Sequence, residues 1–134
     1  MAVVIAAPAS GSGKTLLTLS LLAWASSQGH SIQPFKVGPD YLDPQLLSAV
    51  AGHPCRNLDI NLCGKAWVER AFHGYGSQRD LALVEGVMGV FDGIGCSEGG
   101  STAAVAKQLR LPVVLVIDAG GQAASLGALS LIHI

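Results

Sequence analysis

Near its start the chain has a short apolar run, Ala2–Ala7, that leads into the string APASGSGKT at Ala7–Thr15. Such a run predicts a buried strand, and Pro8 with the glycines and serines after it predicts a tight loop. The leucine-rich stretch Lys14–Ser27 then predicts a helix that ends near Gly29. A strand, a glycine-rich loop and a helix in this order are typical of a parallel α/β domain.

The loop has the composition of a phosphate-binding loop. Glycines allow backbone N–H groups to turn toward phosphate oxygens, and the N-terminus of the following helix adds positive potential. The ammonium of Lys14 is suited to bridge phosphates, and the hydroxyl of Thr15 is suited to bind Mg²⁺. We therefore expect ATP and Mg²⁺ as cofactors, with nucleotide contacts from Gly11, Ser12, Gly13, Lys14 and Thr15.

The loop departs from the usual pattern at its first position. Pro8, with its fixed φ, stands where GxxxxGK[ST] loops have their first glycine. The alternative interpretation is an ordinary Gly/Ser turn that caps the helix. A bound anion is favoured over that alternative, because Lys14 at a helix N-terminus opposes the helix dipole.

The rest of the chain continues the alternation of strands and helices. Predicted strands are Ile32–Val37, Leu81–Val84 and Pro112–Ile117, and predicted helices are Pro44–Ala51, Ala66–Phe72, Ser101–Leu109 and one that follows Gly120 and Gly121. Lys36–Pro44 is a structured loop, whereas Cys55–Gly64 has no clear pattern and is expected to be irregular. With right-handed crossovers, this order predicts an α/β fold with a doubly wound, mainly parallel sheet, helices on both faces, and a P-loop NTPase-like arrangement.

Net charge and cysteine content limit the kinds of partner that we expect for this chain. The formal net charge is -1 and Lys and Arg form no run, so neither nucleic acid nor an anionic membrane is an expected partner. Cys55, Cys63 and Cys96 are odd in number and lack CxxC spacing, which favours neither a disulfide framework nor a zinc site. The N-terminal apolar run is too short for a signal peptide or a membrane span. We expect a cytoplasmic protein that acts on a small molecule.

Three carboxylates follow predicted strands. Asp40 and Asp43 lie just after the second strand, and Glu85 ends the third. The carboxyl ends of parallel strands meet at one edge of the sheet, so all three side chains are candidate Mg²⁺ ligands. Thr15, Asp43 and Glu85 are the expected Mg²⁺ ligands. The alternative for Asp40 and Asp43 is a structural role in the proline-containing turns.

Further polar residues are weaker candidates. Lys36 ends the second strand and is suited to hold a substrate carboxylate or phosphate. Asp92 lies in a glycine-bounded loop and Asp118 ends a strand, so both are placed to face the same crevice, although a turn or cap role is an equal alternative. Arg56 and Asn57 receive no role.

Four strings stand out together: APASGSGKT, KVGPDYLDP (Lys36–Pro44), RNLD (Arg56–Asp59) and EGVMGVFDG (Glu85–Gly93). Two more, GGSTA (Gly99–Ala103) and LPVVLVIDA (Leu111–Ala119), fit with them. These strings resemble one family, the cobyrinate a,c-diamide synthases. The resemblance covers the chain up to its last six residues.

The resemblance implies an ATP-dependent, glutamine-dependent carbon-nitrogen ligase of cobalamin biosynthesis. In such an enzyme ATP phosphorylates the a- and c-acetate carboxylates of cobyrinate, and ammonia from glutamine displaces the phosphate to leave amides. The expected catalytic residues are Lys14, Asp40, Asp43 and Glu85, and the expected substrate contacts are Lys36, Tyr41, Leu42 and Asp92.

The resemblance also sets the expected domain organisation. We expect residues 1–128 to form an ATP-binding amidoligase domain that is incomplete at its C-terminus. Residues 129–134 (LSLIHI) resemble a translated sequencing adapter and are expected to be a non-native tail, the alternative being that they continue an apolar helix. In this family the glutaminase half, with its nucleophilic cysteine, lies in a later domain, so this chain is expected to lack it and to be inactive alone. The sequence leaves open whether the protein forms a homodimer.

Two alternatives remain for the function. The enzymes acting on nickel-sirohydrochlorin and hydrogenobyrinate amidate the same two side chains, so the tetrapyrrole and its metal are open. The alternative from another class is a ParA- or MinD-like ATPase switch that acts through protein partners. That family places a second lysine where Ala9 stands, and it gives no reason for KVGPDYLDP.

Overall fold

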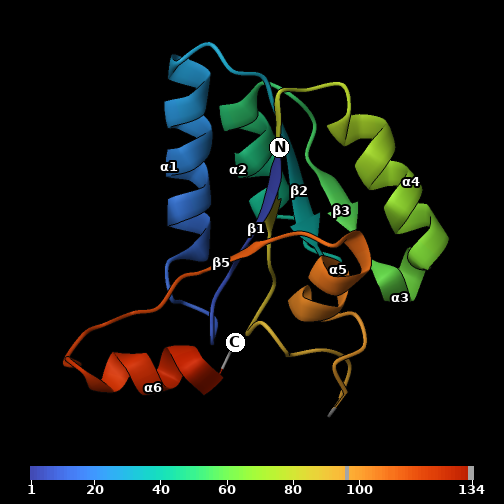
Figure 1. Ribbon diagram of the computed structural model, residues 1–134. Coiled ribbons are helices and arrows are strands. Elements are labelled where there is room, and N and C mark those ends of the chain that lie inside the picture. The colour runs from blue at the N-terminus through green and yellow to red at the C-terminus, as the bar shows by residue number, and fades with distance from the viewer. Residues whose placement is uncertain (96, 133–134) are drawn as a thin grey trace.

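The computed structural model describes residues 1–95 and 97–132, and within them the chain forms a five-stranded sheet (Figure 1). Every paired strand is parallel to its neighbour. Across the sheet the strands are β3 (Arg56–Leu58), β2 (Ile32–Val37), β4 (Leu81–Glu85), β1 (Ala2–Ala6) and β5 (Val113–Leu115). The predicted α/β fold with a doubly wound parallel sheet is confirmed.

Helices cover both faces of this sheet (Figure 1). Side chains that alternate along a strand point to opposite faces, so Val4 and Ile5 of β1 enter two different core clusters. The cluster around Ile5 contains residues of α1 (Lys14–Ser27) and α2 (Asp43–Ala51). The cluster around Val4 contains residues of α4 (Lys65–Gly76) and α5 (Thr102–Leu109). The two remaining helices in the described part are α3 (Ile60–Cys63) and α6 (Ser125–Ile132).

The strand register brings distant parts of the sequence together at the carboxyl edge of the sheet. Glu85 at the end of β4 is the Cα partner of Ile5 in β1 on one side and of Lys36 in β2 on the other. The loops that follow these three strands therefore leave the sheet side by side. Ligands of doubly wound folds bind at this edge.

Several predicted elements differ from the observed ones. The expectation that Cys55–Gly64 is irregular is wrong, because this stretch contains β3 and α3. A three-residue strand is too short to show a periodic pattern, and it forms by pairing with β2. The predicted strand Pro112–Ile117 shortens to β5, and the helix expected after Gly121 begins at Ser125.

The last residues of the chain are described only in part. Of the tail expected at residues 129–134, the first four residues belong to α6. His133 and Ile134 lie outside the described residues, as does Cys96.

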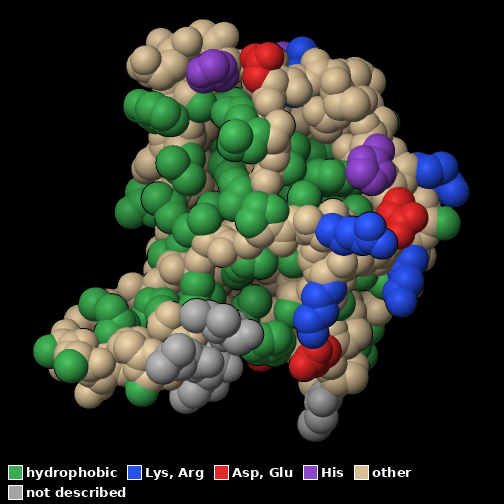
Figure 2. Space-filling view, in the orientation of Figure 1, with side chains coloured by type: hydrophobic (Ala, Val, Ile, Leu, Met, Phe, Trp, Pro, Cys, Tyr) green, Lys and Arg blue, Asp and Glu red, His purple; other side chains and the backbone are tan. Residues whose placement is uncertain are grey.

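The two sides of the view in Figure 2 differ in the kinds of side chain that the described residues expose. Hydrophobic side chains gather over α1 and the neighbouring sheet, and Lys and Arg side chains lie mostly over α4 and α5. Trp24 of α1 is 62% exposed. No helix in the described part of the chain is long and apolar enough to cross a membrane.

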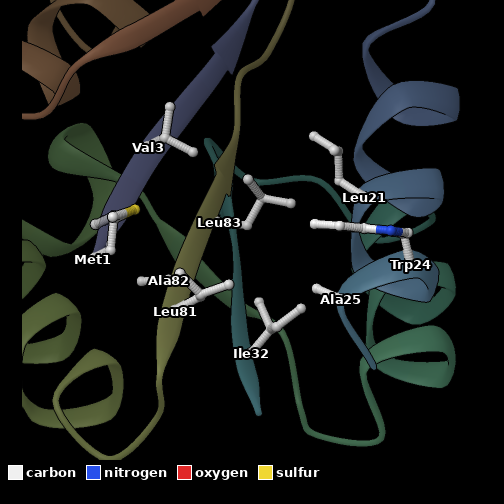
Figure 3. A pocket seen from close by; sticks show the side chains of 10 residues that line it. Met1, Val3, Leu21, Trp24, Ala25, Ile32, Leu81, Ala82 and Leu83 are labelled. Atoms are coloured by element: carbon white, nitrogen blue, oxygen red, sulfur yellow. The ribbon is translucent and has the colours of Figure 1, made fainter. Parts of the chain in front are cut away.

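An apolar pocket of about 200 Å³ lies between α1 and the amino-terminal ends of β1, β2 and β4 (Figure 3). Trp24 and Leu21 face it from the helix, and Val3 and Leu83 face it from the sheet. This pocket is at the opposite end of the strands from the loop that follows β1. It is therefore separate from the carboxyl edge.

Candidate functional site

The loop between β1 and α1 depends on two glycines with left-handed backbone. Gly11 has φ 78° and Gly13 has φ 91°, and a Cβ added to either would meet nothing within 4 Å. Backbone conformation, and not lack of space, therefore requires glycine here. Such conformations form the concave rows of N–H groups that bind anions. The Ser12 hydroxyl donates to the carbonyl of Ala9 at 3.0 Å.

Lys14 begins α1 and is almost fully buried, with 7% of its surface exposed. Its ammonium donates to the carbonyl of Ala9 at 3.0 Å and to that of Met88 at 2.7 Å. Burial, and then the nearby charge of Lys36, lower the pKa of Lys14. The first turn of α1 contains no acidic residue and has no side-chain cap. This helix end can therefore accept an anion.

Beside this loop, four charged or polar side chains from different elements meet. The Lys36 ammonium lies 2.6 Å from Asp43 Oδ2 and 2.8 Å from Glu85 Oε1. The Thr15 hydroxyl donates to Glu85 Oε1 at 2.7 Å and lies 3.5 Å from Asp43 Oδ2. The structure thus brings Lys36 together with Thr15, Asp43 and Glu85, the three residues expected from the sequence to share one site.

The electrostatics of this cluster follow from its burial. Glu85 is fully buried, and burial raises its pKa despite the neighbouring ammonium. Burial alone would lower the pKa of Lys36, but hydrogen bonds to Asp43 and Glu85 outweigh it and the pKa is raised. Burial would likewise raise the pKa of Asp43, but Lys36 lowers it. Lys36 therefore stays charged between two carboxylates.

The loop after β2 is held by Asn57, a residue that received no role from the sequence. Its side-chain amide donates to the carbonyls of Gly38 and Asp40, both at 2.8 Å. Asp40 Oδ1 accepts the N–H groups of Leu42 at 2.9 Å and Asp43 at 3.3 Å, and Asp40 Oδ2 lies 3.6 Å from the Lys36 ammonium. Asp40 thus stabilises the turn after β2 and also lies near the Lys36 ammonium. The string RNLD was the only sequence signal for Asn57.

The remaining candidates are Tyr41, Leu42, Asp92 and Asp118. Tyr41 and Leu42 are 81% and 75% exposed, so both side chains are accessible to a ligand. Asp92 Oδ2 accepts the N–H of Gly89 at 2.8 Å. Asp118 Oδ1 accepts the N–H of Gly120 at 2.8 Å, within its own turn. The structure therefore gives Asp92 and Asp118 turn contacts.

The oxygens of Thr15, Asp43 and Glu85 suit a hard cation. Mg²⁺ binds one or two carboxylates and completes its shell with phosphate oxygens and water. Glu85 Oε2 is buried and has no hydrogen-bond partner among the described residues, so it retains a free acceptor. No group of three or more His, Cys, Asp or Glu side chains within residues 1–95 and 97–132 is arranged to hold a metal by itself. Phosphate oxygens would have to supply further ligands.

The chain is similar to known proteins along most of its length. The family described as CobQ/CobB/MinD/ParA nucleotide binding domain matches residues 3–127. The chain is 49% identical over 129 residues to a cobyrinate a,c-diamide synthase of Gloeobacter violaceus, covering 96% of this chain and 28% of that protein. It is 50% identical over 127 residues to a hydrogenobyrinate a,c-diamide synthase of Streptomyces coelicolor, covering 94% of this chain and 26% of that protein. The chain thus spans little more than a quarter of the length of these relatives.

Proposed function

The chain belongs to the family of CobQ/CobB/MinD/ParA nucleotide binding domains, and we propose that it binds MgATP as the ATP-binding part of an amide-forming ligase. The proposed reaction converts the a- and c-acetate carboxylates of cobyrinate, or of a close tetrapyrrole, into amides. The observation that carries the proposal is the contact between the loop of Lys14 and Thr15 and the buried cluster of Lys36 and Glu85. The names of the relatives support the substrate class.

Each group of the site has a part in phosphoryl transfer. In this proposal the loop N–H groups and Lys14 bind the phosphates. The Lys36 ammonium, which lies beside Asp43 and Glu85, is assigned the role of neutralising charge that develops on the transferred phosphoryl group. A substrate carboxylate oxygen attacks the γ-phosphorus, ADP leaves, and an acyl phosphate forms. Ammonia then attacks the acyl carbon and phosphate leaves. Alignment of the two reactants supplies much of the rate.

Mg²⁺ would be held by Thr15, Asp43 and Glu85 together with the phosphates of ATP. The metal would supply charge neutralisation on the phosphate oxygens. The two carboxylates present their oxygens on one side of the loop, within 3.5 Å of the Thr15 hydroxyl. Removal of Mg²⁺ is expected to weaken ATP binding.

Ammonia is proposed to come from glutamine, through chemistry that this cluster does not perform. Release of ammonia from glutamine needs a reactive thiolate. Burial raises the pKa of Cys55 to about 12, which keeps that thiol protonated. Cys55 is therefore unsuited to this step.

The proposal is tested by substitution of the two carboxylates in the full-length protein. Asp43→Asn and Glu85→Gln are each expected to slow amide formation from cobyrinate, ATP and free ammonia by about tenfold or more, or about 1.4 kcal/mol of barrier. Glu69→Gln, at an exposed position of α4, is the matched control. Product is measured by mass spectrometry. Normal amidation by both variants would contradict the assigned roles, and ATP hydrolysis indifferent to cobyrinate would favour the ATPase switch.

A further inference from the structure

The ammonium of Lys14 is held by a carbonyl that is far away in the sequence. Its shorter hydrogen bond, at 2.7 Å, goes to Met88 and not to Ala9 of its own loop. Met88 lies in the loop after β4. The position of the Lys14 ammonium therefore depends on how that loop is built.

Met88 has a backbone conformation that its own side chain does not explain. Its φ is 47°, and it is one of two non-glycine residues with positive φ in the described part of the chain. L-residues adopt this region at a cost in energy. The side chain of Met88 is 44% exposed, so packing of the side chain does not compensate. In this conformation the carbonyl of Met88 accepts the hydrogen bond from the Lys14 ammonium.

The backbone on both sides of Met88 is fixed. The Thr102 hydroxyl, which is fully buried, accepts the N–H of Val87 at 3.0 Å and lies 3.2 Å from the carbonyl of Val87, to which it donates. On the other side, Gly89 lies so close to the loop of Lys14 that an added Cβ would be 2.5 Å from the carbonyl of Pro8. Val90 donates its N–H to the carbonyl of Ala7 at 2.8 Å.

We propose that Thr102 is a positioning residue for Lys14: its hydroxyl fixes Val87, and thereby the Met88 carbonyl that holds the Lys14 ammonium. The proposal rests on the proposed function, because Lys14 is taken to bind the phosphates of ATP. Through Val87 and Met88, the proposal links Thr102 at the N-terminus of α5 to Lys14 in the loop after β1. Thr102 is fully buried, so we assign it no direct contact with ATP or substrate.

The first test needs no nucleotide. In Thr102→Val, which keeps the shape of the side chain but removes its hydroxyl, Lys14 is expected to react severalfold faster with trace acetic anhydride. Exposed Lys65 is the internal reference, and the labelled peptides are read by mass spectrometry. Thr102→Ser is expected to restore the slow labelling. Val105→Ala, a core change in the same helix, controls for loss of stability.

The second test measures affinity for MgATP by calorimetry. Thr102→Val is expected to weaken binding about tenfold, a coupling of the usual size for residues in one network, with recovery in Thr102→Ser. Unchanged Lys14 labelling and unchanged affinity in a folded Thr102→Val protein would overturn the proposal. If the unsubstituted protein binds no MgATP, the proposed function fails, while the labelling result still decides the positioning role.

Discussion

At the scale of single residues, the site depends on one ammonium between two carboxylates. Lys36 is 3% exposed and contacts both Asp43 and Glu85. Without Lys36 the buried carboxylate of Glu85 would lose its cationic partner, and an unpaired buried charge is costly. The same residue therefore stabilises the buried end of β4 and reduces the negative charge of the carboxylates beside the loop of Lys14.

Thiol reactivity gives a prediction that depends on pH. Burial raises the pKa of Cys55 to about 12, whereas Cys63 is exposed. The thiolate is the reactive form, so below the raised pKa Cys55 stays protonated. Between about pH 7 and 9, iodoacetamide is expected to alkylate Cys63 and to leave Cys55 unmodified. Peptide mapping by mass spectrometry measures both, and equal labelling in the folded protein would contradict the burial of Cys55.

Among the elements, the short helix α3, which the sequence patterns did not predict, is capped at its start by Asp59. Asp59 Oδ1 accepts the N–H groups of Asn61 at 2.8 Å and Leu62 at 3.0 Å at the start of α3. Asp59→Ala is expected to lower the free energy of unfolding by about 1 kcal/mol, because these N–H groups lose their acceptor. Asp59→Asn keeps an acceptor and is the control. Urea unfolding followed by circular dichroism measures the change, and equal stability of the Ala variant and the parent would exclude the cap.

The elements also show what sequence can and cannot predict. The bounds of α1 and β2 match the prediction, because Gly29 marks a clear end and β2 is a continuous buried run. The short strand β3 was missed because it exists through pairing with β2, which is not a local property. In the site, Lys14, Lys36 and Glu85 were found from residue type and position after strands. Met88 was missed because it acts through its backbone carbonyl, which any residue has. Asn57 was missed because its side-chain amide binds carbonyls of a loop that is distant in the sequence.

At the scale of the whole molecule, the two ends of the sheet differ in chemistry. The carboxyl edge carries the phosphate loop and the charged cluster, and the amino edge carries the apolar pocket beside Trp24 (Figure 3). Figure 1 shows the loops after β1 and β4 at the same edge of the sheet. We therefore propose that the nucleotide binds at the carboxyl edge.

Calorimetric titration of the protein with MgATP tests directly whether the loop of Lys14 binds phosphate. We predict saturable binding that Lys14→Ala weakens by about tenfold or more, because the phosphates lose a charged contact. Lys107→Ala, at a side chain that is 71% exposed, is expected to bind as the unsubstituted protein does. Equal MgATP affinity in the Lys14→Ala and unsubstituted proteins would contradict a phosphate-binding role for this loop.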